Sequence, residues 1–344
     1  MAALLQATYL PGLTGGRCAT EGTRPVVLEV CAGAGGQSLG LEQAGFGHLA
    51  LIENDPHACG TLRANRPHWN VIEADVRACS ARDLGHVDLF AGGVPCPPFS
   101  HAGKQMGGDD TRDLFPDALR LIGECAPDAV MIENVRGLLD PKFDAYRADI
   151  VARLGDLGYR TTWQLVRACD FGVPQLRPRS VLVGLRPEAH DRFTWPSPEP
   201  VAPPTVGECL VDLMGARGWE GAEAWARGAG AIAPTLVGGS KRHGGPDLGP
   251  TRAKRQWADL GIDGLGIADH PPPPGFVGAP RLTVAMAARL QGFPDDWRFA
   301  GGKTAAYKQV GNAFPSPVAR AVGAQILKAL AVPVAMTGQA VGVP

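Results

Sequence analysis

The chain of 344 residues lacks several features, and each absence excludes a class of protein. No apolar run approaches the ~18–20 residues of a membrane span. The start MAALLQATYLPGL lacks the basic residues and long apolar core of a signal peptide. At 45% hydrophobic and 19% charged residues, the chain is too apolar for a disordered protein. A net charge of −1 gives no overall nucleic-acid signature, although a local basic strip would suffice for binding.

The eight cysteines include no C-x-x-C pair, which argues against a zinc ribbon or a redox dithiol. They are also too sparse for a disulfide scaffold, so we expect a reducing, cytoplasmic compartment and no metal. Most of them are expected to act as small buried apolar residues. Cys96 differs because three prolines flank it.

Short apolar runs alternate with helical patterns in the first half of the chain, which predicts βαβ units and an α/β fold with a mostly parallel sheet. Strands are predicted over 26–31, 48–52, 87–91, 129–132 and 181–185, and a helix over 38–44. Polar residues follow the strand ends, where the ligand crevice of such a sheet lies.

The pattern changes after about residue 186, where Pro and Gly become frequent and the alternation is lost. We interpret 187–280 as an inserted, smaller and irregular domain, and 281–306 as a connecting helical segment. Helical patterns return over 283–291 and 317–330. The main domain is then predicted over 1–186 and 307–330, with a frayed tail over 331–344.

The first motif, Glu29-Val-Cys-Ala-Gly-Ala-Gly-Gly36, places glycines after the first predicted strand, where they let the backbone approach a nucleotide-like ligand. Glu53 lies about 20 residues further, where a carboxylate accepts from ribose hydroxyls. Asp75 is a candidate for an adenine amino group, or an ordinary surface residue. The Gly-x-Gly-Gly spacing and the lack of a phosphate-binding lysine argue against a dinucleotide site and a P-loop.

Three further motifs carry candidate functional side chains. Prolines stiffen the loop Gly92–Ser100 and hold the Cys96 thiol in one place, which suits a nucleophile, although a structural cysteine is the plainer reading. Glu133 follows a strand, where a carboxyl group beside a nucleophile handles a proton; the alternative is a helix N-cap. Arg177 and Arg179 would point the same way in an extended chain and suit a carbonyl oxygen or phosphates, or form a solvated pair.

These motifs, in this order, resemble those of the DNA cytosine-5 methyltransferase family. The segment 29–36 looks like the cofactor loop, Pro95-Cys96 the nucleophile motif, 133–135 the proton-handling motif and 175–179 (Gln-x-Arg-x-Arg) the base-holding motif. Downstream, 281–297 resembles the motif after the recognition domain, and 308–313 the last motif, whose Asn312 returns to the cofactor. The family usually has Asp at Glu29, an aromatic residue at Cys31 and often a large apolar residue at Asn54.

The resemblance implies a Rossmann-like methyltransferase domain of the prokaryotic modification type, with 187–280 as its target-recognition domain. It implies S-adenosylmethionine as methyl donor and S-adenosylhomocysteine as product, and a flipped cytosine in double-stranded DNA as target. Cys96 would attack C6, Glu133 would grip N3 and N4, Arg179 would hold O2, and Arg177 would support the same edge or a phosphate. The cofactor would be held by Cys31, Ala32, Gly33, Ala34, Gly36, Glu53, Asn54, Asp75, Val76, Pro95 and Asn312.

DNA contacts are expected from two segments. The polar segment 100–113 resembles a lid over the flipped base. The segment 240–255 has five basic residues and one acidic residue and would neutralise phosphates, unless it is simply a solvated charge run. The expected DNA-binding residues are Ser100, Gln105, Lys241, Arg242, Arg252, Lys254 and Arg255.

We expect a monomer that acts at the nucleoid in a restriction-modification or epigenetic system, with a cognate endonuclease as functional partner. A transfer-RNA cytosine-5 methyltransferase is the alternative with the same chemistry, and the basic strip in the inserted segment favours DNA over it. A non-catalytic DNA-binding module is a further alternative, but intact Cys96, Glu133 and Arg179 argue against it. The missing G-x-G-x-x-G disfavours a Rossmann oxidoreductase.

Overall fold

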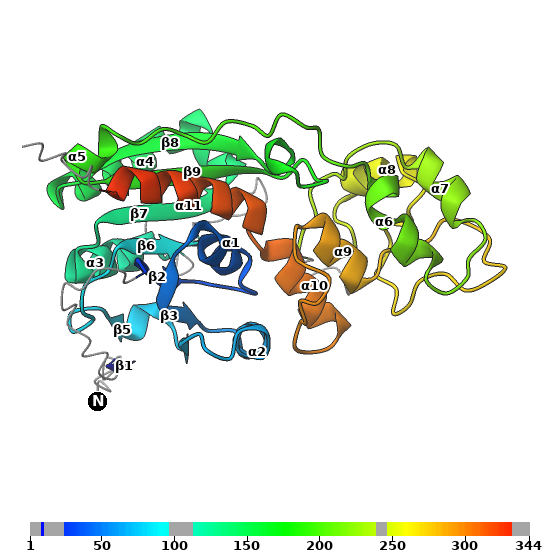
Figure 1. Cartoon of the computed structure of the whole chain (residues 1–344), viewed down its shortest axis with the longest axis horizontal. Helices are drawn as coiled ribbons and strands as arrows, with labels where there is room; N and C mark the ends of the chain where they lie inside the picture. The colour runs from blue at the N-terminus through cyan, green and yellow to red at the C-terminus, as the bar shows by residue number, and fades with distance from the viewer. Residues whose placement is uncertain (1–7, 10–23, 96–112, 239–245, 332–344) are drawn as a thin grey trace, which may run out of the picture.

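The computed structural model describes residues 8–9, 24–95, 113–238 and 246–331, and its centre is a seven-stranded sheet with the order β4-β3-β2-β6-β7-β9-β8 (Figure 1). The strands are β2 (Val26–Val30), β3 (Gly47–Glu53), β4 (Val71–Glu73), β6 (Leu89–Gly92), β7 (Ala129–Val135), β8 (Arg160–Arg167) and β9 (Pro178–Leu185). The pairs from β4 to β7 are parallel, and β9 runs antiparallel to both β7 and β8. The predicted α/β class with a mostly parallel sheet is confirmed. A short parallel pair joins β1 (Thr8–Tyr9) to β5 (Cys79–Ser80).

Helices cover both faces of the sheet, so the central strands are apolar on both sides. On β2, Val27 belongs to the same buried cluster as Leu41 and the α11 side chains, while Leu28 and Val30 belong to the cluster that contains side chains of α3 and α4. The helices of this domain are α1 (Gly36–Ala44), α2 (Pro56–Asn65), α3 (Phe115–Cys125), α4 (Asp144–Asp156) and α11 (Ser316–Leu330). A strand buried on two faces reads as a continuous apolar run, which is why these strands were predictable.

Helix α1 lies directly on the chain that leads into α11. A Cβ atom at Gly36 would lie 2.2 Å from the Phe314 carbonyl oxygen, and one at Gly40 would lie 2.3 Å from that of Ser316. Only glycine allows this approach, because the nearest atom at both positions is a backbone carbonyl oxygen, which has no rotamer to change. The contact brings residues 312–314 beside the glycine-rich loop that precedes α1.

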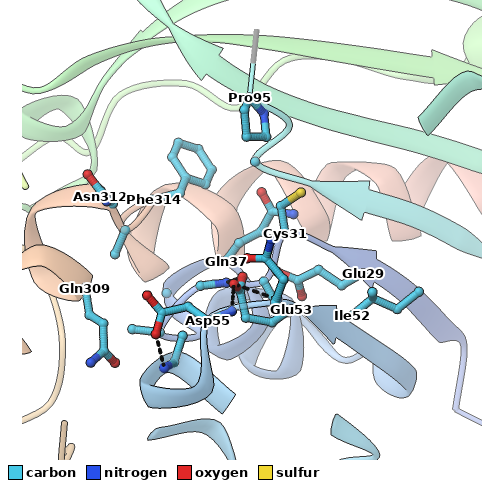
Figure 2. A pocket seen from close by; sticks show the side chains of 18 of the residues that line it. Glu29, Cys31, Gln37, Ile52, Glu53, Asp55, Pro95, Gln309, Asn312 and Phe314 are labelled. Atoms are coloured by element: carbon cyan, nitrogen blue, oxygen red, sulfur yellow. Dashed lines mark hydrogen bonds between the residues drawn. The ribbon is translucent and has the colours of Figure 1, made fainter. Parts of the chain in front are cut away.

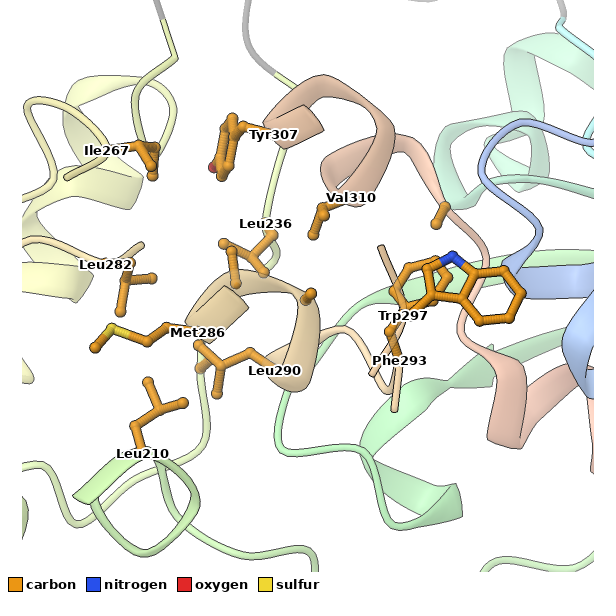
Figure 3. Packing of buried hydrophobic residues seen from close by; sticks show 14 of the residues in the cluster. Leu210, Leu236, Ile267, Leu282, Met286, Leu290, Phe293, Trp297, Tyr307 and Val310 are labelled. Atoms are coloured by element: carbon orange, nitrogen blue, oxygen red, sulfur yellow. The ribbon is translucent and has the colours of Figure 1, made fainter. Parts of the chain in front are cut away.

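The segment after β9 is helical and irregular, and its described residues form no strand beyond isolated bridges. It contains α5 (Pro187–His190), α6 (Val206–Gly215), α7 (Ala222–Gly228) and α8 (Thr251–Asp259). Its buried side chains share one apolar cluster with α9 (Val284–Leu290) and α10 (Lys303–Asn312). Figure 3 shows Leu236 between Met286 and Leu290 of α9 and Tyr307 and Val310 of α10. None of the described helices has the length and hydrophobicity to span a bilayer.

Candidate active site

A cavity of about 370 Å³ lies at the carboxyl ends of β2, β3, β6 and β7, where a parallel sheet is expected to bind its ligand. This volume falls within the ~300–1,000 Å³ of small-molecule sites. All the predicted cofactor residues line it: Cys31, Ala32, Gly33, Ala34, Gly36, Glu53, Asn54, Asp75, Val76, Pro95 and Asn312. The structure therefore brings the set together, and their binding of a cofactor stays a prediction.

Glu53 anchors the glycine-rich loop to the end of β3. Its Oε2 accepts from the Gly33 N–H at 2.8 Å, and its Oε1 accepts from the N–H groups of Asn54 at 2.9 Å and Asp55 at 2.8 Å (Figure 2). The loop turns sharply here, with φ of +53° at Cys31 and +55° at Gly33. A carboxylate with two oxygens keeps lone pairs beyond these three bonds, so Glu53 can still accept from a ligand hydroxyl.

Two buried polar side chains of the cavity lining, Glu29 and Gln37, make no hydrogen bond of ordinary geometry with a described residue. Ser38 and His48 lie near the Glu29 carboxyl group, with His48 Nδ1 4.0 Å from Glu29 Oε2. Glu29 is 1% exposed, and burial raises the pKa of its carboxyl group from 4.5 to about 8. Buried polar groups normally form hydrogen bonds, so a carboxyl group and a carboxamide that form none here are suited to bind a polar, charged ligand. The first motif begins at Glu29, which lies on β2, but Gln37 was missed because it lies beyond the motif, in the first turn of α1.

Glu133 reaches the same cavity and forms an ion pair with Arg179. The two side chains are about a tenth exposed, with 2.9 Å between Arg179 Nε and Glu133 Oε1. The antiparallel pairing of β7 with β9, in which Val135 lies opposite Arg179, places them together. Burial raises the pKa of Glu133, and the Arg179 charge opposes this shift. Such a carboxyl group is suited to holding or donating a proton.

The strand end that precedes Cys96 lies against this pair. A Cβ at Gly93 would lie 3.2 Å from Glu133 Oε2, and the neighbouring Asn134 Nδ2 donates to the Val94 carbonyl at 2.8 Å. Pro95 lines the cavity. Cys96 itself, the predicted nucleophile, lies outside the described residues, as do Ser100, Gln105, Lys241 and Arg242.

The prediction that Arg177 and Arg179 point the same way from an extended chain is wrong. Arg177 has φ of +22° and its side chain is 1% exposed. Its Nη1 donates to the Leu236 carbonyl at 2.7 Å, and its Nη2 donates to those of Gly311 and Ala313, both at 2.8 Å. Because these bonds occupy the fork of the guanidinium, the structure supports a bracing role for Arg177 and not the predicted contact with a base or phosphate.

Asp75 lines the cavity but also caps the turn Val76–Ala78 and pairs with Arg77, whose Nε lies 2.9 Å from Asp75 Oδ1. The hydrogen bond from the Arg77 side chain lowers the pKa of Asp75. Ile52 and Phe314 supply apolar lining that was not predicted, although each neighbours a motif residue. His86, Asp88 and Asp128 are the group of potential metal ligands found among the described residues, and they lie at the opposite end of β6 and β7.

Helix α8 carries the described part of the basic strip. Arg252 and Arg255 are exposed, whereas Trp257 on the same helix is buried. Lys254 Nζ lies 2.7 Å from Asp247 Oδ2, so its charge is already paired. The two arginines are therefore better placed to meet a phosphate than Lys254.

Comparisons with known proteins agree with this geometry. Residues 26–232 and 274–328 match the family described as C-5 cytosine-specific DNA methylase. The chain is 58% identical over 311 residues to the Type II methyltransferase M.NaeI of Lentzea aerocolonigenes, covering 88% of this chain and 75% of that protein. It is 56% identical over 306 residues to the Type II methyltransferase M.NgoMIV of Neisseria gonorrhoeae, covering 88% and 97%. The fold is similar to that of the methyltransferase EhMeth of Entamoeba histolytica, with a TM-score of 0.63, 14% identity and coverage of 90% and 100%.

Proposed function

The chain belongs to the C-5 cytosine-specific DNA methylase family, and on that premise we propose that it methylates C5 of a cytosine within one short sequence of double-stranded DNA. One observation carries the proposal. A single cavity is lined both by the glycine-rich loop with its anchor Glu53 and by Glu133 and Pro95. A methyl donor held at the first group and a base held at the second would meet in the same space.

Members of this family use S-adenosylmethionine, whose sulfonium supplies the methyl group. In this chain Glu53 would accept from its ribose hydroxyls. Glu29 and Gln37, whose side-chain polar atoms make no hydrogen bond of ordinary geometry with a described residue, would meet its charged amino-acid end. Asn312 and Phe314 come from the far end of the sequence and line the same cavity, so they would complete the site.

We assign the reaction steps to three side chains. The Cys96 thiolate would add to C6 of the cytosine while Glu133 delivers a proton to N3, which turns C5 into a nucleophile able to accept the methyl group. Arg179 keeps Glu133 oriented and would hold O2 of the base. Loss of the C5 proton to a base, with departure of the Cys96 thiolate from C6 and return of the N3 proton to Glu133, would restore the aromatic ring. Because a stacked cytosine cannot reach the cavity, the target base must leave the helix.

We propose that 187–280 selects the DNA sequence, with Arg252 and Arg255 of α8 contacting phosphates, and that 1–186 with 307–330 carries out catalysis. In this scheme 281–306 links the two parts; the tail predicted over 331–344 lies, apart from Ala331, outside the described residues. We further propose that the enzyme acts as a monomer, without a metal ion, on DNA that a cognate endonuclease would otherwise cleave. A monomer suffices because each strand of a palindromic site presents its own cytosine.

The test is to treat a mixed DNA with the protein and S-adenosylmethionine and to map 5-methylcytosine by bisulfite sequencing. Methylation confined to one sequence, and lost in Cys96→Ser, is the expected result. A competition between duplex DNA and transfer RNA for labelled methyl groups separates the DNA enzyme from the RNA alternative. Methyl groups on an exocyclic amine, or a preference for transfer RNA, would refute the proposal.

A further inference from the structure

Buried hydrogen bonds join the proposed recognition segment, 187–280, to the last predicted motif, 308–313. Arg177 donates on one side to the Leu236 carbonyl and on the other to the carbonyls of Gly311 and Ala313. Its guanidinium thereby holds residues 236 and 311–313 a fixed distance apart. Because the side chain is fully buried, these bonds form in a low-dielectric setting where a lost partner is costly.

Gln175 forms a hydrogen bond to the same residue, Leu236. Its Oε1 accepts from the Leu236 N–H at 2.9 Å, and its Nε2 donates to Gln291 Oε1 at 2.8 Å. Gln291 in turn donates to the Ala313 carbonyl at 2.5 Å. Leu236 is thus bonded through both its N–H and its carbonyl, so the backbone at this point has little freedom to retreat.

Two residues later, Gly238 lies against the end of α10. A Cβ at Gly238 would lie 2.2 Å from Asn312 Oδ1 and 2.7 Å from Asn312 Cγ. A Cβ at Gly311 would in turn lie 2.5 Å from both N and Cα of Gly238. The Asn312 carboxamide therefore lies directly on a piece of bare backbone from the recognition segment.

Asn312 is also part of the cavity lining, beside Phe314 and Gln309 (Figure 2). We propose that Gly238 is a positioning residue that sets the Asn312 side chain toward the cofactor, so that the recognition segment controls cofactor affinity. The inference rests on the proposed function, because it takes the cavity as the cofactor site. A side chain at position 238 would displace Asn312, since the bonds to Leu236 oppose movement of the recognition backbone.

The test compares Gly238→Ala with Gly230→Ala, a matched control in the same segment whose added Cβ meets its nearest atom only at 3.9 Å. The probe is S-adenosylhomocysteine, titrated by calorimetry into each purified full-length protein. We expect Gly238→Ala to weaken binding about tenfold or more and the control to bind within about twofold of the parent protein. In steady-state assays the KM for S-adenosylmethionine should rise far more than kcat falls, which general damage to the fold would not produce.

A double-mutant cycle with Asn312→Ala shows whether the effect passes through that side chain. The expected result is that Gly238→Ala changes affinity by less than about twofold once Asn312 is truncated. If Gly238→Ala alone does not fold, the double variant removes the clash and should fold. Parent-like binding by Gly238→Ala, an undiminished effect in the Asn312→Ala background, or a double variant that still does not fold would overturn the inference. A parent protein that does not bind the probe would instead refute the proposed function.

Discussion

Replacing Arg177 with Met tests whether this side chain braces the fold or holds the substrate. Met has a similar length and no donor, so it fills the buried space but leaves the carbonyls of Leu236 and Gly311 without their bond to the guanidinium. Ala313 keeps the donor from Gln291. At ~1–3 kcal/mol for each buried group left unsatisfied, the loss in unfolding free energy is about 2–6 kcal/mol.

The measurement is urea denaturation of Arg177→Met beside Arg320→Met, a control at an exposed position on α11. The control should change the unfolding free energy by less than about 0.5 kcal/mol. Arg177→Lys should fall between Met and the parent, because a single ammonium group cannot span the carbonyls of Leu236 and Gly311. If Arg177→Met were as stable as the parent but inactive at saturating DNA, the bracing role would be wrong and the original assignment to the base would stand.

Three further changes probe the site and the DNA surface. Glu53→Gln replaces one of the two carboxylate oxygens that accept from the Gly33, Asn54 and Asp55 amides. It should therefore lower the free energy of unfolding by about 1–3 kcal/mol and weaken the binding of S-adenosylhomocysteine. Calorimetry that shows parent-like affinity would contradict this. Burial raises the pKa of Glu29 from 4.5 to about 8 in the folded protein, so the free energy of unfolding falls as the pH rises from about 4.5 to 8. Glu29→Gln should remove the Glu29 contribution to this pH dependence, which is measured by unfolding both proteins at about pH 6 and about pH 8. Arg252→Ala with Arg255→Ala should reduce the slope of log affinity for DNA against log salt by about 2 and leave thermal stability unchanged, whereas an unaltered slope would remove α8 from the DNA surface.

The central strands and the cofactor cavity were predictable because both depend on local patterns. Strands buried on two faces are continuous apolar runs, and the residues that follow them must meet at one edge of a parallel sheet. Strand β8 was missed for the opposite reason. It is one of the two edge strands of the seven-stranded sheet, most of its side chains are partly or fully exposed, and it therefore shows no apolar run.

The role of Arg177 was not predictable from spacing. Two arginines at i and i+2 share a face only in an extended chain, and the positive φ at Arg177 breaks that rule. Its partners lie 59 to 136 positions away along the sequence, and no local pattern reports such contacts. The spacing did place Glu53 at the cavity, but its three bonds to backbone amides depend on the turn at Cys31 and Gly33.

The contact of α1 with residues 314–316 has a consequence for synthesis on the ribosome. The loop, Glu53 and Glu133 emerge early, whereas Asn312 and Phe314 are among the last parts of the described chain to be made. A nascent or truncated chain that stops before them carries a pocket with one wall missing. Methylation activity should therefore begin only after Asn312 and Phe314 have been made, and products terminated before them should be inert toward the cell's DNA.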